Sequence, residues 1–353
     1  MPVRVGVVGL GGVAERIHLP ACAAVPGLEI VAGVEPNAQT RQSVAAKFNL
    51  RETYPSVEEL LAKAKPDFLI VGTPPGSHYK ICQQALEAGV HVFCEKPFMP
   101  TVDEACRIVE LAREKNLLLR VNNQYRYMTF YAETKRRLEQ GEFGRPYFIQ
   151  CWQQMFHPPG KESNWRSSLK QYVLFEFGTH ALDLACFFFD SLPATVNVST
   201  PKVSPDYDAD ILVHATLQFP AERLATFSFN RISHAPEKYL EMRIDCEKAS
   251  IRISLGGVAR FSIDWAKNSK RFYMKHGFVR GGQARAEVNG LPRTFCNSAK
   301  PEFAAATAEH LKLFLQQMAS AQRPIDAAEH ARDVLKLVFA GYQSANSGET
   351  VRL

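Results

Sequence analysis

The sequence predicts an α/β protein in two parts: an N-terminal doubly wound parallel sheet, followed by an α+β part with a large, open-faced, mainly antiparallel sheet. Up to about residue 123, short β-branched runs alternate with helical periodicities, which is typical of a parallel sheet covered by helices. After residue 145, apolar residues alternate with a period of two, as in an antiparallel sheet with one covered face. Because 353 residues exceed the usual size of one hydrophobic core, we expect two domains, at residues 1–123 and 124–353.

Five β-branched or apolar runs predict the strands of the parallel sheet. They are Val3–Val8, Glu29–Gly33, Phe68–Gly72, His91–Cys94 and Leu117–Asn122. Two of the helices between them begin with a capping box, in which a hydroxyl side chain and a glutamate three residues later each satisfy a backbone N–H group. These boxes pair Ser56 with Glu59 and Thr101 with Glu104.

The second sheet is predicted from three alternating segments, at residues 211–219, 240–244 and 251–255. Two helices close the chain, because apolar residues recur at helical spacing over residues 311–318 and again over residues 334–342. Residues 266–301 are rich in Gly, Arg and Lys, so we expect a long loop or insertion there.

Composition and charge argue against several classes of protein. The net charge of +6 is spread along the chain, and the longest basic cluster is flanked by glutamates, so no nucleic-acid partner is expected. The eight cysteines lack CxxC spacing, which argues against a metal site or disulfides. No apolar stretch reaches the ~20 residues of a membrane span, and no signal-peptide pattern precedes the first strand. We therefore expect a cytoplasmic protein with no membrane contact.

A glycine-rich turn follows the first strand immediately. Residues 9–14 read GLGGVA, a GxGxxA variant of the dinucleotide-binding fingerprint. In such a turn the first glycine permits the tight bend, the second lets the backbone approach a pyrophosphate, and the alanine lets helix and strand pack closely. The context of strand, turn and helix favours a Rossmann dinucleotide site over an ordinary turn.

An acidic residue, Glu35, ends the second strand in the window where a carboxylate accepts hydrogen bonds from the adenosine ribose. Because a carboxylate repels a 2′-phosphate, Glu35 favours NAD over NADP. Arg41 follows closely and could bind such a phosphate, so NADP remains an alternative. A solvated acid at a strand end is the other interpretation of Glu35.

Two further segments end at the carboxyl edge of the sheet, where ligands of open α/β folds bind. Residues 73–78 read TPPGSH after the third strand, and residues 95–97 read EKP after the fourth. A hydride leaving a carbinol carbon requires the hydroxyl proton to leave too, so a base must lie near that oxygen, and a fixed cation lowers the cost of the developing negative charge. Lys96 is expected to supply this cation or to relay the proton.

A second cluster, at residues 176–183, reads EFGTHALD. If the segment is helical from about residue 178, His180 and Asp183 share one face, and Glu176 lies one turn before His180. Histidine is the natural acid and base near neutral pH, although a buried core histidine is the alternative. Because Glu176 and His180 lack an evident third ligand, no metal site is expected.

These motifs, in this order, resemble the Gfo/Idh/MocA family of oxidoreductases. The resemblance also rests on the stretches at residues 123–126, 165–166 and 348–351, and it spans nearly the whole chain. It implies an NAD(P)-binding Rossmann domain and a C-terminal substrate domain whose open sheet forms homodimers or homotetramers. It also implies oxidation or reduction of sugars, polyols and related small molecules.

The resemblance further implies roles for single residues. Lys96 matches the family's catalytic lysine, with a cis bond expected before Pro97, and His180 matches the proton donor or acceptor. Glu176 stands where the family commonly has Asp, so an orienting role with altered geometry is expected. The expected cofactor-binding residues are Gly9, Gly11, Gly12, Val13, Ala14, Glu35, Thr73, Pro74, Pro75, His78, Glu95, Lys96, Gln124 and Arg166. The expected substrate-binding residues are Lys96, Arg126, His157, Asn164, Trp165 and His180.

We therefore predict an NAD(P)-dependent dehydrogenase or reductase that moves a hydride between the nicotinamide and a secondary alcohol or its carbonyl. Packing or surface roles remain open for residues 126, 157 and 164–166. One alternative function is glycoside cleavage through transient oxidation by tightly held NAD. Another is a non-catalytic dinucleotide-binding regulator, against which the intact Lys96 and His180 argue.

Overall fold

The computed structural model describes residues 2–158, 160, 165–235, 238–256, 258–266, 271–279, 281–320 and 324–353. Asn164, one of the expected substrate-binding residues, lies outside the described residues. The chain forms two compact units. The first comprises Met1–Tyr127 and Phe303–Phe339, and the second comprises Met128–Glu302 and Ala340–Leu353.

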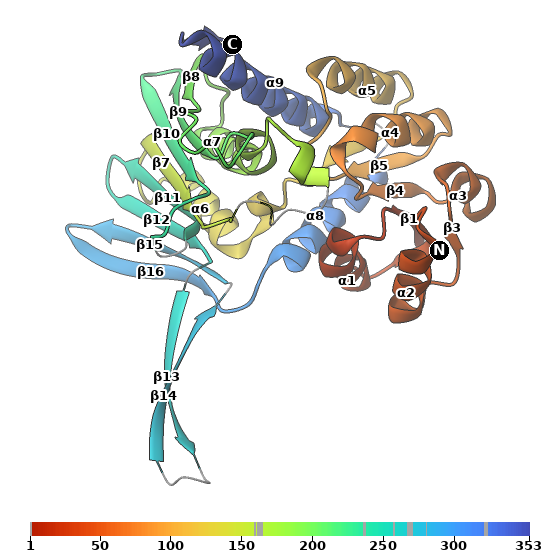
Figure 1. Ribbon diagram of the computed structural model, residues 1–353, viewed down its shortest axis with the longest axis horizontal. Helices are drawn as coiled ribbons and strands as arrows, with labels where there is room; N and C mark the ends of the chain where they lie inside the picture. The colour runs from red at the N-terminus through yellow and green to blue at the C-terminus, as the bar shows by residue number, and fades with distance from the viewer. Residues whose placement is uncertain are drawn as a thin grey trace. The chain divides into compact units, whose positions relative to one another are not determined.

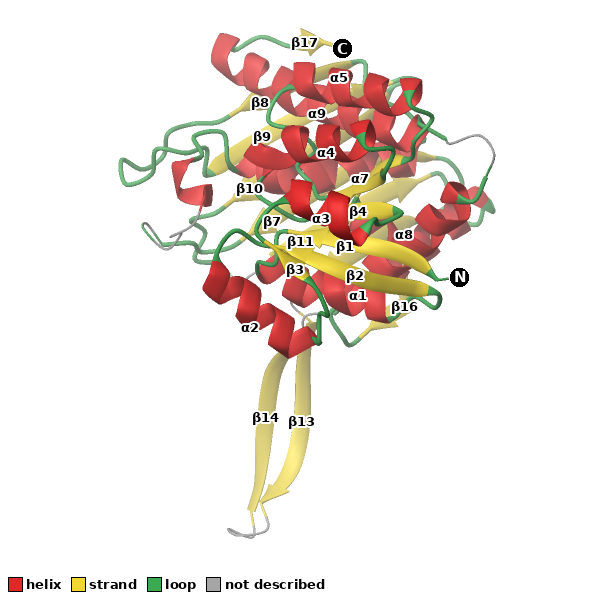
Figure 2. Cartoon of the chain, turned by 90° about the vertical axis from the view of Figure 1, so that its right-hand side faces the viewer, coloured by secondary structure: helices red, strands yellow, loops and turns green. Residues whose placement is uncertain are grey.

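A six-stranded, all-parallel sheet forms the centre of the first unit. Its strands are β1 (Val3–Val8), β2 (Leu28–Val34), β3 (Thr53–Tyr54), β4 (Phe68–Val71), β5 (His91–Cys94) and β6 (Leu119–Val121). The strand order β3-β2-β1-β4-β5-β6 is that of the dinucleotide-binding fold, with β1 between β2 and β4 (Figure 2). All five predicted strands are confirmed within two residues. The unexpected β3 has only two residues, too few for a periodic signal.

Helical segments follow each strand of the first unit. They are η1 (Ala14–His18), α1 (Leu19–Ala23), α2 (Ala38–Phe48), α3 (Val57–Ala64), η2 (Pro75–Ser77), α4 (His78–Glu87), α5 (Val102–Glu114), η3 (Gln124–Tyr127), α8 (Phe303–Met318) and most of α9 (Asp326–Ser347). Both capping boxes are confirmed as helix starts. The N–H of Glu59 donates to the Ser56 hydroxyl at 3.3 Å, and the N–H of Glu104 donates to that of Thr101 at 3.2 Å.

The late helix α8 packs into the core of the first unit. The ring of Phe314 lies 5.0 Å from that of Phe68 and 5.5 Å from that of Phe93, between centroids. Leu311 is buried in the same cluster. The apolar side of α8 thus covers one face of the parallel sheet. The predicted division into residues 1–123 and 124–353 did not include this late helix in the first unit.

A nine-stranded mixed sheet forms the second unit (Figure 1). Its strands are β7 (Pro146–Gln154), β8 (Thr195–Ser199), β9 (Leu212–Phe219), β10 (Arg223–Asn230), β11 (Lys238–Cys246), β12 (Ser250–Leu255), β15 (Gly282–Val288), β16 (Leu291–Ser298) and β17 (Val351–Arg352). Among the described strand pairs of this sheet, only β7–β10 is parallel. The helical segments are α6 (Thr129–Glu139), η4 (Trp165–Ser168), η5 (Val173–Gly178), α7 (Thr179–Phe189) and the end of α9. The α/β fold class, with one parallel sheet and one mainly antiparallel sheet, is thereby confirmed.

The prediction of a long loop over residues 266–301 is wrong. Strands β15 and β16 extend the large sheet, and β14 (Arg271–Val279) pairs with β13 (Val258–Ala266) in a ribbon that extends from the second unit (Figures 1 and 2). In β15 the buried side is made by the small residues Ala284 and Ala286. Alternation between alanine and polar residues gives a weak hydrophobic signal, so the composition of the segment resembled that of a loop.

Candidate active site

The predicted dinucleotide turn lies between β1 and η1. Gly9 has φ +86°, and a Cβ atom there would lie 2.8 Å from Cγ2 of Thr73, so this position requires glycine. A Cβ atom on Gly11 would meet no atom within 4 Å, which leaves open space against the backbone. The carbonyl of Gly11 accepts from the N–H of Glu15, so the helix begins here and the N–H groups of its first turn have no intrahelical partners. These features fit the pyrophosphate of a dinucleotide.

The acid that was predicted to select the cofactor, Glu35, lies directly after β2. One of its oxygens accepts from the N–H of Asn37 at 3.1 Å. Arg41 donates to the backbone carbonyls of Glu35 and Pro36, at 2.5 and 3.2 Å. Because a carboxylate can accept about four hydrogen bonds, Glu35 can also accept from ribose hydroxyls. With Arg41 bound to the backbone, this end of the strand fits NAD better than NADP.

Replacing Glu35 with serine is expected to raise the KM for NAD about 10- to 100-fold, because a hydrogen bond to a charged group contributes about 1.5–3 kcal/mol. The KM for NADP should rise less or fall, since the repulsion of its phosphate is removed. Steady-state kinetics with both cofactors gives the ratio of the KM for NAD to the KM for NADP. The matched control is Glu29→Gln, which changes an acid at the other end of β2. An unchanged ratio in the Glu35 variant would contradict the assignment.

The expected lysine follows β5, and the peptide bond between Lys96 and Pro97 is cis, as expected. The preceding Glu95 turns its carboxylate inward. One oxygen lies 3.1 Å from Nε2 of His18 and accepts from the amide of Asn122 at 2.7 Å. The other oxygen accepts from the backbone N–H of Lys96 at 3.2 Å. The carboxylate of Glu95 therefore fixes the backbone that carries Lys96.

This buried network connects three parts of the first unit. The Asn122 amide also donates to the Thr307 hydroxyl of α8 at 3.2 Å, and His18, Asn122 and Thr307 have no exposed surface. Burial alone would raise the pKa of Glu95, but its contacts with His18, Asn122 and Lys96 outweigh burial and lower that pKa, so the carboxylate stays charged. His18 was not among the predicted site residues, although it follows the fingerprint on the buried side of the helix.

A second buried histidine, His78, joins two loops at the carboxyl edge of the sheet. Its Nε2 lies 2.8 Å from the carbonyl oxygen of Thr73, and its Nδ1 lies 3.0 Å from that of Phe98. Thr73 is held further by the Ser77 hydroxyl, which donates to its side chain at 2.8 Å. The ring of His78 is fully buried. His78, expected to contact the cofactor, is placed by the structure to fix the turn that contains Thr73, Pro74 and Pro75.

Acid should weaken the first unit through His78. Burial lowers the pKa of His78 below its ordinary value of 6.5, and its hydrogen bonds to Thr73 and Phe98 oppose this only in part. The stability that it contributes is therefore complete above pH 6.5 and is lost as the pH falls from there towards the folded-state pKa. One proton gives a slope of up to about 1.4 kcal/mol per pH unit.

Thermal or urea unfolding between pH 7.5 and about 5 checks this expectation by comparing the wild type with His78→Gln. The variant should be less stable at pH 7.5 and should lose less stability on acidification. If the free energy of unfolding falls equally steeply with pH in the two proteins, His78 does not titrate in this way.

The expected acid and base residues of the second unit lie on η5 and α7. Glu176 is in the π-helical turn, and His180 follows it in the first turn of α7; both are buried. The carboxylate of Asp210 caps this segment by accepting from the N–H groups of Tyr172, Val173 and Leu174. Asp210 was not predicted as a cap, because it lies 36 to 38 residues along the chain from the N–H groups that it accepts from.

The structure brings two of the expected site residues into direct contact. Arg166 donates to one oxygen of Glu176 through Nε and Nη2, at 3.1 and 2.6 Å. The Arg166 guanidinium also lies 4.3 Å from the centre of the Trp165 ring. Because Glu176 is buried and Arg166 is half-buried, this ion pair fixes the carboxylate one turn before His180.

The remaining expected residues are more dispersed. Gln124 is buried, and among the described residues its amide oxygen has no hydrogen-bond partner, which suits a group that contacts a ligand. Arg126 contacts His330 of α9 within the first unit. His157 lines a pocket of the second unit.

No cluster of three or more potential metal ligands occurs in the part of the chain that the structure describes. Among the same residues, no helix is long and apolar enough to span a membrane.

Each of the two units contains a segment that matches a known family of protein domains. Residues 3–123 match a family described as an oxidoreductase family with an NAD-binding Rossmann fold. Residues 131–252 match the GFO/IDH/MocA C-terminal domain.

Single relatives extend this similarity. An uncharacterised oxidoreductase of Schizosaccharomyces pombe is 30% identical over 286 residues, which are 78% of this chain and 72% of the relative. A UDP-N-acetylglucosamine 3-dehydrogenase of Acidithiobacillus ferrooxidans is 27% identical over 324 residues, covering 92% and 90% of the two chains. The fold matches that of an Agrobacterium radiobacter oxidoreductase solved with NAD⁺, L-tartaric acid and magnesium, with a TM-score of 0.84, 18% identity, and 100% and 98% coverage. The chain therefore belongs to the Gfo/Idh/MocA family of NAD-dependent oxidoreductases.

Proposed function

We propose that the chain transfers a hydride between NAD and a secondary hydroxyl or carbonyl group of a sugar, polyol or related small molecule. NAD, when bound, supplies the hydride acceptor or donor. The observation that carries the proposal is the contact between His18, on the helix after the glycine turn, and Glu95, the neighbour of Lys96. This contact ties the dinucleotide turn to the loop that carries the expected catalytic cation.

Three side chains are assigned to the reacting oxygen and its proton. Lys96 stabilises negative charge on that oxygen as the alcohol is oxidised. His180 accepts the hydroxyl proton and returns it in the reverse direction. Glu176 orients His180, and Arg166 restrains Glu176 through their ion pair.

Two observations support a sugar-like substrate and an oligomeric enzyme. The Acidithiobacillus relative is named for oxidation of a nucleotide sugar at its 3-position. In β9, buried residues alternate with more exposed ones such as His214 and Gln218, so one face of the large sheet is open. We propose a cytoplasmic homodimer or homotetramer that forms through this face.

A substrate screen tests the proposed reaction. The purified protein is mixed with NAD or NADP and a panel of free sugars, polyols and their oxidised forms, and absorbance at the NADH band is followed. Net NADH formation with a free sugar or polyol supports the proposal. Cleavage of glycosides without net NADH would indicate the transient-oxidation reaction instead. Dinucleotide binding with no turnover on any compound would favour a regulator.

A further inference from the structure

The second unit contains a cavity of about 340 Å³. Small-molecule sites begin at about 300 Å³, so it can hold a compound of sugar size. Its lining includes Tyr172, Tyr207 and the half-buried His157, together with Arg166, whose ion pair with Glu176 links the cavity to the segment that carries His180.

The most unusual residue of the lining is Arg231, which follows β10 and is only 3% exposed. Its guanidinium lies 4.2 Å from the centre of the Phe177 ring. One Nη atom contacts the sulfur of Met155 at 2.6 Å, and the other lies 3.4 Å from Nδ1 of His157. Its Nε is buried, and no acceptor for it occurs among the described residues. Burying a cation without a counter-ion costs several kcal/mol, so this arrangement favours an anion from outside the chain.

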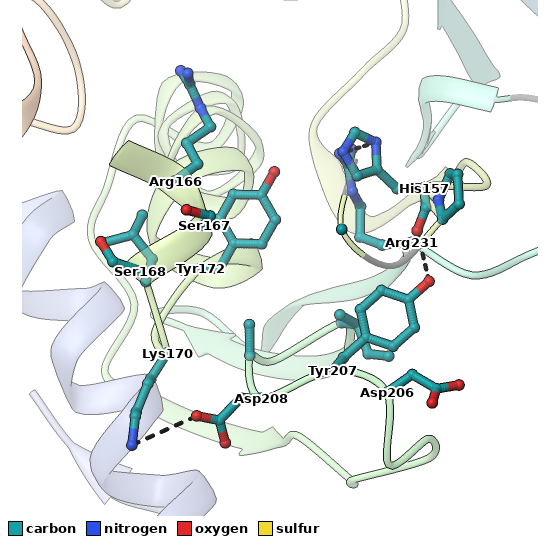
Figure 3. Close-up of a pocket in the computed structure, with 15 residues that line it drawn as sticks. His157, Arg166, Ser167, Ser168, Lys170, Tyr172, Asp206, Tyr207, Asp208 and Arg231 are labelled. Atoms are coloured by element: carbon teal, nitrogen blue, oxygen red, sulfur yellow. Dashed lines mark hydrogen bonds and ion pairs between the residues drawn. The ribbon is translucent and has the colours of Figure 1, made fainter. Parts of the chain in front are cut away.

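The other arginine and lysine of the lining already have carboxylate partners. Arg166 is paired with Glu176, and Lys170 lies 3.6 Å from Asp208. Figure 3 shows the Arg231–His157 pair and the Lys170–Asp208 pair on different sides of the pocket. Within the part of the chain that the structure describes, Arg231 is the cation of this lining that has no carboxylate partner.

We propose that the cavity binds the carboxylate of a sugar acid and that Arg231 is its counter-ion. This inference rests on the proposed function and narrows the substrate to polyhydroxy acids such as hexuronates and aldonates. A single guanidinium neutralises a carboxylate and can hold both of its oxygens. A phosphate monoester brings up to about two charges, and one guanidinium neutralises only one of them.

Two neighbours of Arg231 suit the same ligand. The His157 imidazole lies beside the guanidinium, with its Nδ1 3.4 Å from Nη2 of Arg231, so it borders the same part of the cavity. Tyr207 donates its hydroxyl to the backbone carbonyl of His157 at 2.7 Å, which fixes that loop. Tyr172 and Tyr207 add aromatic surface for a sugar ring.

Isothermal titration of the NADH-saturated full-length protein, which cannot oxidise the alcohol groups of the ligands, tests the proposal. The ligands are D-glucuronate, D-galacturonate, D-gluconate and D-galactonate, with D-glucose, D-galactose and D-glucose 6-phosphate as comparisons. We expect at least one acid to bind about tenfold or more tighter than its neutral parent. Arg231→Gln should remove this preference, and Arg231→Lys should keep part of it. The matched control is Arg243→Gln, an arginine of the same sheet that is paired with Asp245 outside the cavity.

Three outcomes would overturn the inference: no acid preference in the wild type, a preference that survives in Arg231→Gln, or tighter binding of the phosphate than of every acid. Thermal melts show whether each variant is folded, and the wild-type comparison of acid with neutral parent remains decisive if Arg231→Gln is not. NADH formation from neutral sugars without acid binding would contradict this inference alone. Acid binding without any turnover would contradict the proposed function alone.

Discussion

Replacing Lys96 with methionine is expected to lower kcat/KM for oxidation of the sugar or polyol about 10²- to 10³-fold. This is the range measured when a group that stabilises developing negative charge is removed. Methionine keeps much of the length of the side chain and removes its charge. Lys96 is also among the expected cofactor contacts, but the glycine turn and Glu35 are untouched, so the Kd for NAD should rise far less than kcat/KM falls. Steady-state kinetics and fluorescence titration with NADH measure the two quantities separately.

The control for this variant is Lys80→Met, which removes an exposed lysine from α4. It should retain wild-type kinetics. If Lys96→Met keeps kcat/KM within a few-fold of the wild type while binding NAD normally, Lys96 is not the cation of the reaction.

Replacing His180 with alanine is expected to reduce kcat/KM about 10²- to 10⁴-fold, because general acid–base catalysis contributes this much. A base must be unprotonated to accept a proton, so oxidation by the wild type should decline on the acid side of its pH profile. The variant should lose this acid limb. A structural role alone would lower activity without flattening the profile.

The matched control for His180→Ala is His234→Ala, which changes an exposed histidine that follows β10 and stacks on Phe156. Its activity and pH profile should be those of the wild type. Full activity of His180→Ala on an identified substrate would remove His180 from the mechanism.

Local signals in the sequence predicted most elements of the first unit. The β-branched runs, the two capping boxes and the glycine turn each depend on residues a few positions apart, and the structure agrees with all of them. The strand order brings the ends of β1, β4 and β5 to one edge of the sheet, as the motifs required. The return of α8 to this sheet was not predictable, because an apolar helix face does not specify which surface it covers.

The contacts that fix the site were the harder part to predict. His18 and Glu95 are far apart in the sequence, and so are Arg231 and His157, and no short spacing indicates either pair. Asp210 caps η5 across a similar distance. Glu176 was expected to orient His180, but its ion pair with Arg166, itself expected to bind the cofactor, emerged only from the fold.

Isotope transfer shows directly whether a hydride moves from carbon of the substrate to NAD. The best substrate of the screen, prepared with deuterium on its carbon-bound positions, is oxidised with unlabelled NAD, and the reduced cofactor is analysed by mass spectrometry. One deuterium per reduced cofactor is expected, together with a rate that falls at least about 10²-fold in the Lys96→Met variant. Reduced cofactor without deuterium, or a reaction of the substrate with no reduced cofactor at all, would contradict the proposed hydride transfer.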